Sequence, residues 1–242
     1  MSENTPLWVP TEAQVASSPM TKFREFCAVR NAVEGVDWTD ATLAVSLRGS
    51  KARLAQFLVK AGGGTRGHAE AVRRFAEAAG AAVVLSPGST GVLPDGHPQN
   101  MHVGGSKGSI SGNFAMGQAR LLIVIGSRGV CQSDCSGIGY PLASQVININ
   151  ADLDDVQHYN NTLPLHGDIG AILTALSGRL AARNLPDDPG RRLWLSECVA
   201  KKREWSAFKA ARFGGQPAYD DVWQRPVLTQ PQAIKAVAAG QR

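Results

Sequence analysis

The chain has 242 residues, of which 43% are hydrophobic, 19% charged and 6% aromatic, and this composition excludes a collagen, a coiled coil and a disordered protein. The formal net charge is +5, but the basic residues are dispersed along the chain, so we expect no nucleic-acid partner. No apolar run of about 18 residues and no secretion signal occurs, which predicts a cytoplasmic protein that makes no membrane contact.

The first 48 residues differ from the rest of the chain. Trp8, Pro10 and Trp38 stand among polar residues that show no strand period. Residues 22–31 alone carry apolar side chains at helical spacing, which predicts one short amphipathic helix. We expect residues 1–48 to form an arm that needs a partner surface in order to fold.

A βαβ unit follows the arm. Residues 55–59 are predicted to form its first strand, which ends at three consecutive glycines. A helix with one apolar face follows, and Gly80 is suited to end it in the left-handed conformation. Residues 81–85 are apolar at every position, as a strand covered on both faces requires.

Two more strands are predicted beyond a long loop. The loop covers residues 86–111 and leads through a short helix at 112–118 to a strand at 121–125. Another strand is predicted at 146–150, and Asp168 is placed to cap the helix that follows. Short apolar strands that alternate with helices predict an α/β fold, a Rossmann-like open parallel sheet with helices on both faces.

The C-terminal part is predicted to be a helix and a linker. Past residue 188, Trp194, Cys198 and Trp205 share one side of a long helical pattern, with Lys201 and Lys202 largely outside it. Two glycines break this helix, and a short helix is possible at residues 232–239. We therefore divide the chain into an arm at 1–48, a nucleotide-binding domain at 49–185, and a C-terminal helix and linker at 186–242.

The glycines after the first strand carry a binding motif. Gly62, Gly64 and Gly67 satisfy G-x-G-x-x-G between a strand and a helix, where backbone amides can hold a diphosphate. The alternative is that glycine only permits the tight turn. A nicotinamide-type fold would place an acidic residue at the end of the second strand, whereas Ser86 and Pro87 stand there.

In an open parallel sheet, ligands bind beyond the carboxyl ends of the strands, so the loops there predict a nucleotide-sized crevice. Arg128 is suited to pair with a phosphate and Asp152 to accept hydrogen bonds from a ribose. The alternative for Arg128 is an ordinary surface ion pair. The candidate cofactor-binding residues are Gly62, Gly63, Gly64, Thr65, Ser86, Gly91, Gly105, Ser106, Gly126, Ser127, Arg128, Asn150, Asp152, Gly167 and Asp168.

Other chemistries are weaker. Gly104 to Gly108 match the G-x-S-x-G of serine hydrolases, but no strong strand precedes Ser106. Cys131 and Cys135 lack the spacing of a zinc pair, and we predict no metal site. The four cysteines are too scattered for a disulfide scaffold, so they are expected to be reduced.

Several motifs in the same order resemble the central domain of thiamine-diphosphate-dependent enzymes, the group of acetolactate synthase, glyoxylate carboligase and trihydroxycyclohexanedione hydrolase. They are Gly62-Gly63-Gly64, the segment from Gly88 to Pro98, the strand and turn from Ala119 to Arg128, and the two segments at 147–152 and 165–168. Thr90 and Arg120 depart from the residues usual in the family. The segment around residues 7–23 resembles the extreme N-terminus of acetoacetyl-CoA synthetases.

The resemblance implies that this domain holds FAD or an adenine nucleotide, or serves as a scaffold, while catalysis belongs to neighbouring domains. The glutamate that activates thiamine diphosphate, and the motif that binds its magnesium ion, are not recognised in the sequence. We therefore expect a central domain or split subunit that acts on C–C bonds next to a carbonyl, has no catalytic residues and is inactive alone. Thiamine diphosphate and magnesium would come through other domains or a protein partner, or through a homo-oligomer. The alternative is a stand-alone module that binds FAD, ADP or CoA, or a regulatory module.

Overall fold

The computed structural model describes residues 56–128, 139–156, 162–182 and 188–240. These residues include most of the predicted domain at 49–185 and of the C-terminal segment at 186–242. The predicted arm at 1–48, its helix at 22–31 and the pair Cys131 and Cys135 lie outside the described residues.

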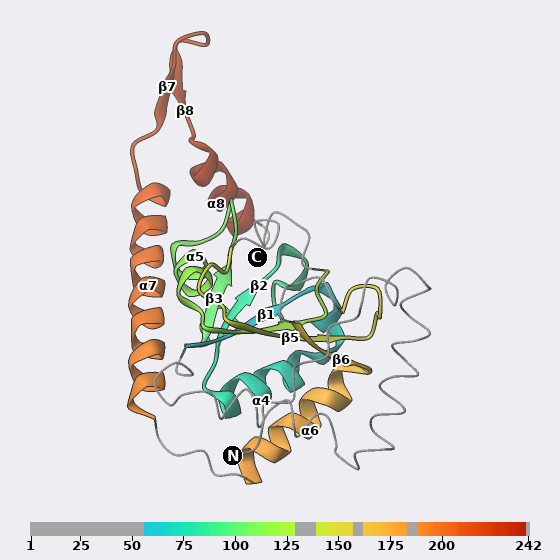
Figure 1. Ribbon diagram of the computed structural model, residues 1–242. Helices are drawn as coiled ribbons and strands as arrows, with labels where there is room; N and C mark the ends of the chain where they lie inside the picture. Colours follow the sequence, from blue (N-terminus) through green and yellow to red (C-terminus); the bar gives the residue numbers. More distant parts are fainter. Residues whose placement is uncertain (1–55, 129–138, 157–161, 183–187, 241–242) are drawn as a thin grey trace, which may run out of the picture.

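A parallel sheet of six strands forms the centre of the molecule (Figure 1). Its order is β3-β2-β1-β4-β5-β6, and every neighbouring pair of strands is parallel. From β1, the chain adds β2 and β3 on one side and then β4, β5 and β6 on the other. Doubly wound sheets bind their ligands at such a switch point, which here lies between β1 and β4. The strands are β1 (Phe57–Ala61), β2 (Ala82–Leu85), β3 (Asn100–Val103), β4 (Leu121–Ile125), β5 (Gln145–Asn150) and β6 (Thr162–His166).

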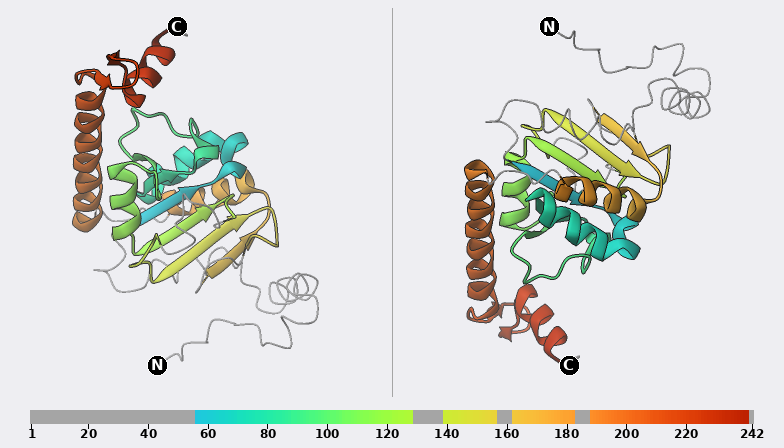
Figure 2. Two further views of the ribbon diagram at one scale, coloured as in Figure 1. Left: turned by 90° about the horizontal axis from the view of Figure 1, so that it is seen from above. Right: turned by 90° about the horizontal axis from the view of Figure 1, so that it is seen from below.

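Helices cover both faces of this sheet, which confirms the predicted α/β fold. Helices α4 (Ala69–Ala79) and α6 (Ile169–Ala182) lie on one face, and α5 (Ile110–Gln118) lies on the other (Figures 1 and 2). Helix α7 (Pro189–Phe213) packs against α5. Two short 3₁₀ helices, η1 (Gly63–His68) and η2 (Pro87–Ser89), follow β1 and β2.

Each face of the sheet has its own apolar core. Phe57, Val59 and Ala61 of β1 join the side chains of α4 and α6 in one buried cluster. Leu58, between them, joins α5 and α7 in the other. Successive residues of a strand point to opposite faces, so a strand covered on both sides needs mostly apolar residues; Lys60 of β1 is a buried exception. This requirement explains the unbroken apolar runs that identified β2 and β4 from the sequence.

The predicted helix ends are confirmed for α4 and α6. Gly80 has φ 63° and donates its amide to Ala76 O, which ends α4 in the left-handed conformation. Asp168 Oδ1 accepts the amide of Ala171 at 2.7 Å and so caps the first turn of α6. The side chain of Ser109 caps α5 in the same way.

Two strands were missed in the sequence. The prediction of an unbroken loop at 86–111 was wrong, because Asn100–Val103 form β3 beside β2. This strand mixes polar and apolar residues and its register shifts against β2, so no clear period marks it. β6 contains Pro164, which lowers the expectation of a strand, but β6 lies at the edge of the sheet, where proline is tolerated.

The C-terminal residues extend away from the sheet domain. After α7 come a hairpin of β7 (Ala218–Asp220) and β8 (Arg225–Val227), which points away from the sheet, and then α8 (Gln230–Gly240), which turns back from the base of the hairpin (Figure 1). Trp194 of α7 is buried and donates Nε1–H to Phe57 O at 3.1 Å, so the start of α7 is anchored to the sheet. No helix in these described residues is long and apolar enough to cross a membrane.

One surface prediction for α7 was wrong. Lys202 was expected largely outside the packed side, but it is only partly exposed, and its Nζ donates to His97 O at 2.6 Å. Burial lowers the pKa of Lys202, and the nearby Lys209 lowers it further against the opposing effect of Asp95. The long aliphatic stem of lysine lets it cover apolar surface while its amine finds a backbone oxygen.

Candidate functional site

Because all six strands are parallel, the turns that follow them lie along one edge of the sheet. This edge holds the turns that begin at Gly62, Ser86, Gly104, Gly126 and Ala151, and the turn at Gly167 and Asp168 after β6. The sequence-predicted site residues therefore share one edge. Their role as ligand contacts stays a prediction.

The glycine turn after β1 packs tightly against the turn after β4. Gly62 N–H donates to Ile125 O at 2.8 Å and Gly64 N–H donates to Gly126 O at 3.0 Å. A Cβ on Gly62 would lie 2.2 Å from Gly126 O, a distance that no side chain tolerates. Gly62 and Gly64 are therefore needed for the close approach of two backbones.

Thr65 closes the same turn. Its backbone amide donates to Gly62 O at 3.0 Å, and its buried hydroxyl donates to the same oxygen at 2.6 Å. The amides of Gly62, Gly64 and Thr65 are thus all occupied within the protein. By contrast, a Cβ on Gly63 or Gly67 would meet nothing within 4 Å, so these two glycines have no steric reason of this kind.

The turn after β2 is filled by serines. Ser86 is buried, and its amide donates both to Ala61 O and to the hydroxyl of Ser89. The Ser89 hydroxyl lies 2.7 Å from Ala61 O and 3.1 Å from the hydroxyl of Ser86. These bonds tie the ends of β1 and β2 together.

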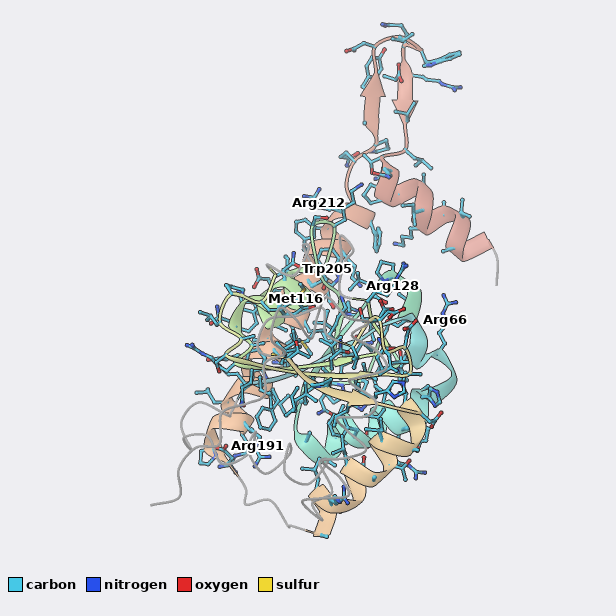
Figure 3. The ribbon with its side chains drawn as sticks, turned by 45° about the vertical axis from the view of Figure 1, so that its right-hand side comes forward. Arg66, Met116, Arg128, Arg191, Trp205 and Arg212 are labelled. Carbon is cyan, nitrogen blue, oxygen red and sulfur yellow. The ribbon has the colours of Figure 1, made fainter. Side chains whose placement is uncertain are left out.

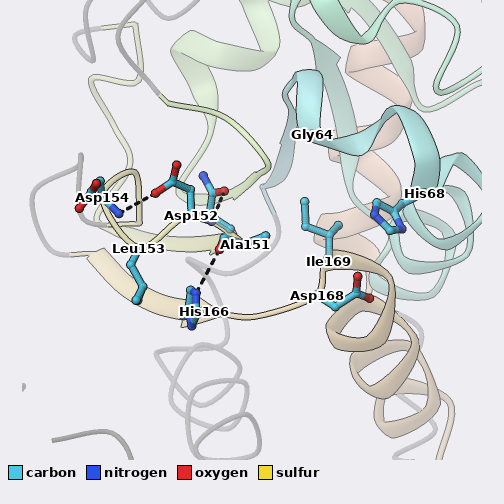
Figure 4. Close-up of a pocket in the computed structure, with 10 residues that line it drawn as sticks. Gly64, His68, Ala151, Asp152, Leu153, Asp154, His166, Asp168 and Ile169 are labelled. Atoms are coloured by element: carbon cyan, nitrogen blue, oxygen red, sulfur yellow. Dashed lines mark hydrogen bonds between the residues drawn. The ribbon is translucent and has the colours of Figure 1, made fainter. Parts of the chain in front are cut away.

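A cavity of about 630 Å³ opens at the carboxyl edge beside the glycine turn (Figure 4). The turns after β5 and β6 form one side, and η1 with the start of α6 forms the other. A volume of this size suits a small organic ligand. The lining residues are Gly64, His68, Asn150, Ala151, Asp152, Leu153, Asp154, His166, Asp168 and Ile169.

Hydrogen bonds fix the wall formed by the turn after β5. Asn150 Oδ1 accepts the amide of Asp152 at 3.1 Å, and Asp152 Oδ1 accepts the amide of Asp154 at 2.9 Å. The side-chain amide of Asn150 donates to Ser127 O at 3.3 Å, which joins this wall to the turn after β4. Asp152 and Asp154 are exposed, so each carboxylate keeps acceptor capacity for a ligand.

The charge of this lining is one-sided. It contains three aspartates and two histidines, but neither lysine nor arginine. His166 Nε2 lies 3.1 Å from Ala151 O, which holds its ring against the turn after β5. Carboxylates that line a cavity accept hydrogen bonds from hydroxyl and amino groups and repel phosphate. The lining therefore favours the sugar or base of a nucleotide over its phosphates.

Two exposed arginines stand on the elements that follow β1 and β4. Arg128 is exposed at the end of the described turn after β4, and Arg66 is exposed on η1. Figure 3 labels both side chains on the same side of the sheet domain. The Arg66 Nε donates to Gly88 O, which joins η1 to the turn after β2.

The cavity unites only some of the sequence-predicted residues. Gly64, Asn150, Asp152 and Asp168 line it, whereas the other candidates lie elsewhere along the edge. Gly91, Gly105 and Ser106 belong to the connections after β2 and β3, at the far side of the sheet order. His68, Leu153, Asp154, His166 and Ile169 line the cavity but were not predicted. His166 is the last residue of β6, so a prediction of that strand would have placed His166 at the carboxyl edge.

The surroundings of the G-x-S-x-G segment differ from those predicted. A strand does precede it, because β3 ends at Val103, so the reason given from the sequence was wrong. Ser106 nevertheless lies exposed in a loop, and α5, which Ser109 caps, begins only at Ile110. A nucleophile elbow places the serine directly on the sharp turn between strand and helix. The local geometry does not match that elbow.

Burial shifts the pKa of Cys198 and of His102, which both lie outside the cavity lining. Burial raises the pKa of the Cys198 thiol, which is free and fully buried, so it stays protonated and unreactive. Burial lowers the pKa of His102, and Lys202 lowers it further. His102 was expected in a loop, but it lies in β3 with φ 62°.

Comparisons with known proteins identify the same part of the chain. The family described as "Thiamine pyrophosphate enzyme, central domain" matches residues 50–176, more than half of the chain. This range contains all six strands of the parallel sheet and most of α6. The match therefore coincides with the part of the chain that builds the carboxyl edge and the cavity.

The similar curated proteins are acetolactate synthases. The one from Mycobacterium bovis is 32% identical over 129 residues, which are 52% of this chain and 21% of that protein. Those from Mycobacterium leprae and Zea mays, the latter chloroplastic, are each 26% identical over 74% of this chain, and over 29% and 28% of their own lengths. This chain thus spans between a fifth and three tenths of the length of these relatives.

Proposed function

Because the chain belongs to the family of the thiamine pyrophosphate enzyme central domain, we propose that it is the scaffold and nucleotide-binding part of such an enzyme. The assembled enzyme acts on C–C bonds next to a carbonyl, in the cytoplasm, and these 242 residues contribute no catalytic group. The observation that carries the proposal is the family match, which falls on the complete parallel sheet.

Thiamine diphosphate, with the magnesium ion that usually accompanies it, is implied by the family, but the described residues do not fit it. Asp168, in the only described Gly-Asp pair that precedes a helix, uses its carboxylate to cap α6. Among the described residues, no three His, Cys, Asp or Glu side chains come together in a way suited to a metal ion. When bound by other domains, thiamine diphosphate supplies the carbanion chemistry that breaks or forms the C–C bond.

The exposed apolar surface at the C-terminal end supports a partner for this chain. Six of its large apolar side chains are more than half exposed: Tyr219, Val222, Trp223, Leu228, Ile234 and Val237. None of the residues of α8 is buried. Exposed apolar residues that gather in one place mark protein contacts. We propose that catalytic thiamine domains, in a partner chain or an oligomer, cover this surface.

The cavity supports the nucleotide-binding part of the proposal. Asp152 lines the cavity and is exposed, so its carboxylate can accept hydrogen bonds from the ribose hydroxyls or the base amino group of an adenosine. FAD and ADP both carry this group, and the cavity volume of about 630 Å³ is in the range of ligand pockets. In this proposal the nucleotide has a structural role.

Calorimetry on the purified chain tests the proposal. We expect no tight binding of thiamine diphosphate in the presence of Mg²⁺, and we expect measurable binding of ADP or FAD. Tight, magnesium-dependent binding of thiamine diphosphate by this chain alone would contradict the scaffold role. If the scaffold role is right, adding separate pyrimidine- and diphosphate-binding domains of an acetolactate synthase to this chain should give a complex.

The cavity also favours a second function, that of a stand-alone nucleotide-binding or regulatory module. In that case the chain would retain FAD, ADP or CoA through purification, and a pull-down would recover no thiamine enzyme domain. Recovery of such a domain on the wild-type chain, and its loss when Trp223 and Val237 are both replaced by Ser, would support the scaffold role instead.

A further inference from the structure

Three amides of the glycine turn are already bonded within the protein and cannot hold a diphosphate. In the phosphate-binding turns of dinucleotide folds, backbone N–H groups point at the ligand. Here the amides of Gly62, Gly64 and Thr65 donate to carbonyl oxygens at 2.8 to 3.0 Å. A phosphate beside this turn therefore needs other donors.

The cavity lining does not provide them. It contains Asp152, Asp154 and Asp168 and no cationic side chain apart from its histidines when they are protonated. Two phosphates brought among three carboxylates would be repelled. A nucleotide whose adenosine occupies the cavity must extend its phosphates outside it, toward positive charge.

Arg66 and Arg128 supply that charge on both sides of the glycine turn. Gly64 N–H bonds Gly126 O at 3.0 Å, so the two turns touch at these glycines. Arg66 follows Gly64 by two residues, and Arg128 follows Gly126 by two residues. Gly64 also lines the cavity, so the turn that carries Arg66 starts at the cavity wall.

One hydrogen bond holds the exposed Arg66 side chain. Its Nε donates to Gly88 O, which fixes the guanidinium between η1 and the turn after β2. No other hydrogen bond or ion pair joins Arg66 to the rest of the described chain, so its two Nη groups keep their donors. A guanidinium fixed through Nε presents a planar pair of donors, the geometry that matches phosphate oxygens.

We propose that Arg66 binds a phosphate of the nucleotide, in place of the bonded amides of Gly62, Gly64 and Thr65, and that it does so together with Arg128. The inference rests on the proposed function, since it presumes adenosine in the cavity. The ligand class is a nucleoside diphosphate, either free as ADP or as part of FAD. Arg66 was not among the residues that the sequence pattern selected.

The test uses the full chain and three titrants: adenosine, ADP and FAD. Arg66→Ala is expected to weaken ADP and FAD binding by about 10- to 100-fold, the effect of losing charge-assisted hydrogen bonds, and to leave adenosine binding unchanged. Arg66→Lys keeps the charge but loses the paired donors, so an intermediate loss is expected. Equal losses for ADP and FAD locate the contact on the diphosphate they share.

Arg74→Ala is the matched control. Arg74 is exposed on α4, and its Nε donates to Glu70, so its removal changes the net charge equally without touching the turn. An equal loss of ADP affinity in both variants would overturn the inference, because net charge alone would explain it. A parallel loss of adenosine binding in Arg66→Ala would also overturn it, because the Gly88 bond would then be merely structural.

The outcome for the wild-type chain separates the two proposals. If wild-type protein binds neither adenosine nor ADP, the nucleotide part of the proposed function fails, and the inference fails with it. If wild-type protein binds ADP and Arg66→Ala binds it equally well, the inference alone fails. Thermal unfolding of each variant checks that the loss of affinity does not come from loss of the fold.

Discussion

The parallel sheet domain and the C-terminal extension, residues 203–240, bury their apolar residues to different degrees. In the sheet, β1, β2 and β4 are buried at every residue, and helices cover both faces. In the extension, Trp223 is 69% exposed, Val222 is 87% exposed, and α8 buries no residue. The boundary falls inside α7, whose Trp194 and Cys198 are buried while its later residues are mostly exposed.

The difference shows which part has found its packing partners within the chain. Burial of apolar surface is the main force that holds a domain together, so the sheet domain is stabilised by its own residues. The extension instead has aromatic rings beside cations at its surface: Arg212 lies over Phe208 and Arg225 over Trp223. Such contacts are worth about 0.5–1 kcal/mol at exposed sites, far less than core packing. Its apolar side chains remain available to another protein.

The largest expected effect comes from replacing one tryptophan in each region. Trp194→Ala removes a side chain that is 1% exposed, stacks on Phe114 and donates to Phe57 O. We expect it to lower the free energy of unfolding by about 3–5 kcal/mol. Trp223→Ala in the hairpin is expected to change it by about 0.5 kcal/mol or less. Urea denaturation measures both.

These two variants can also break the comparison. A loss in Trp223→Ala as large as that in Trp194→Ala would mean that the hairpin packs into the fold in solution. Trp194→Phe is a useful intermediate, because it keeps an aromatic ring beside Phe114 but loses the hydrogen bond to Phe57 O. We expect it to fall between wild type and Trp194→Ala.

A smaller effect is expected from alanine at glycines in the two regions. Gly62→Ala places a Cβ 2.2 Å from Gly126 O, so the turns after β1 and β4 must separate, at a cost of about 1–3 kcal/mol. Gly63→Ala meets nothing within 4 Å, and at Gly214, in the extension, the nearest atom is Ala210 O at 3.5 Å. Both controls should stay within about 0.5 kcal/mol of wild type in the same assay. Tolerance of Gly62→Ala would show that the two turns are not in contact.

Much of the sheet was predictable because its signal is local. A run such as Leu121–Ile125 is apolar at every position, and only a strand covered on both faces explains so short a run. β3 and β6 gave no such signal, since Asn100 and His102 are polar and Pro164 removes an amide donor. Their strand geometry comes from pairing with β2 and β5, which local sequence cannot show.

The sequence predicted the edge of the sheet at which the candidate site lies, but not the cavity itself. The rule that parallel strands end together placed Asn150, Asp152 and Asp168 on one side of the sheet. The rule does not show which turns leave a cavity between them. That depends on contacts such as Gly64 against Gly126, which closes the sheet's centre and leaves the opening beside β5 and β6. The same contact uses up amides that the glycine motif alone suggests are free.

The smallest expected effect concerns charge, and it appears as acid sensitivity of the sheet domain. Hydrogen bonds from Arg73 and Arg74 lower the pKa of Glu70 from its ordinary 4.5 to about 2. A carboxyl group whose pKa is lower in the folded state stabilises the fold above its ordinary pKa, and this contribution is lost as pH falls from about 4.5 toward 2.

Glu70→Gln should therefore lose a little stability at neutral pH and almost none near pH 2. The difference should be small and weaken with salt, because the group is fully exposed. Glu204→Gln, which breaks the Lys201 pair in the extension, is the control, and we expect a smaller difference at neutral pH. Unfolding by urea across this pH range measures both variants. A Glu70→Gln difference that stays constant from pH 7 to pH 2 would show that the charge of Glu70 is not its cause.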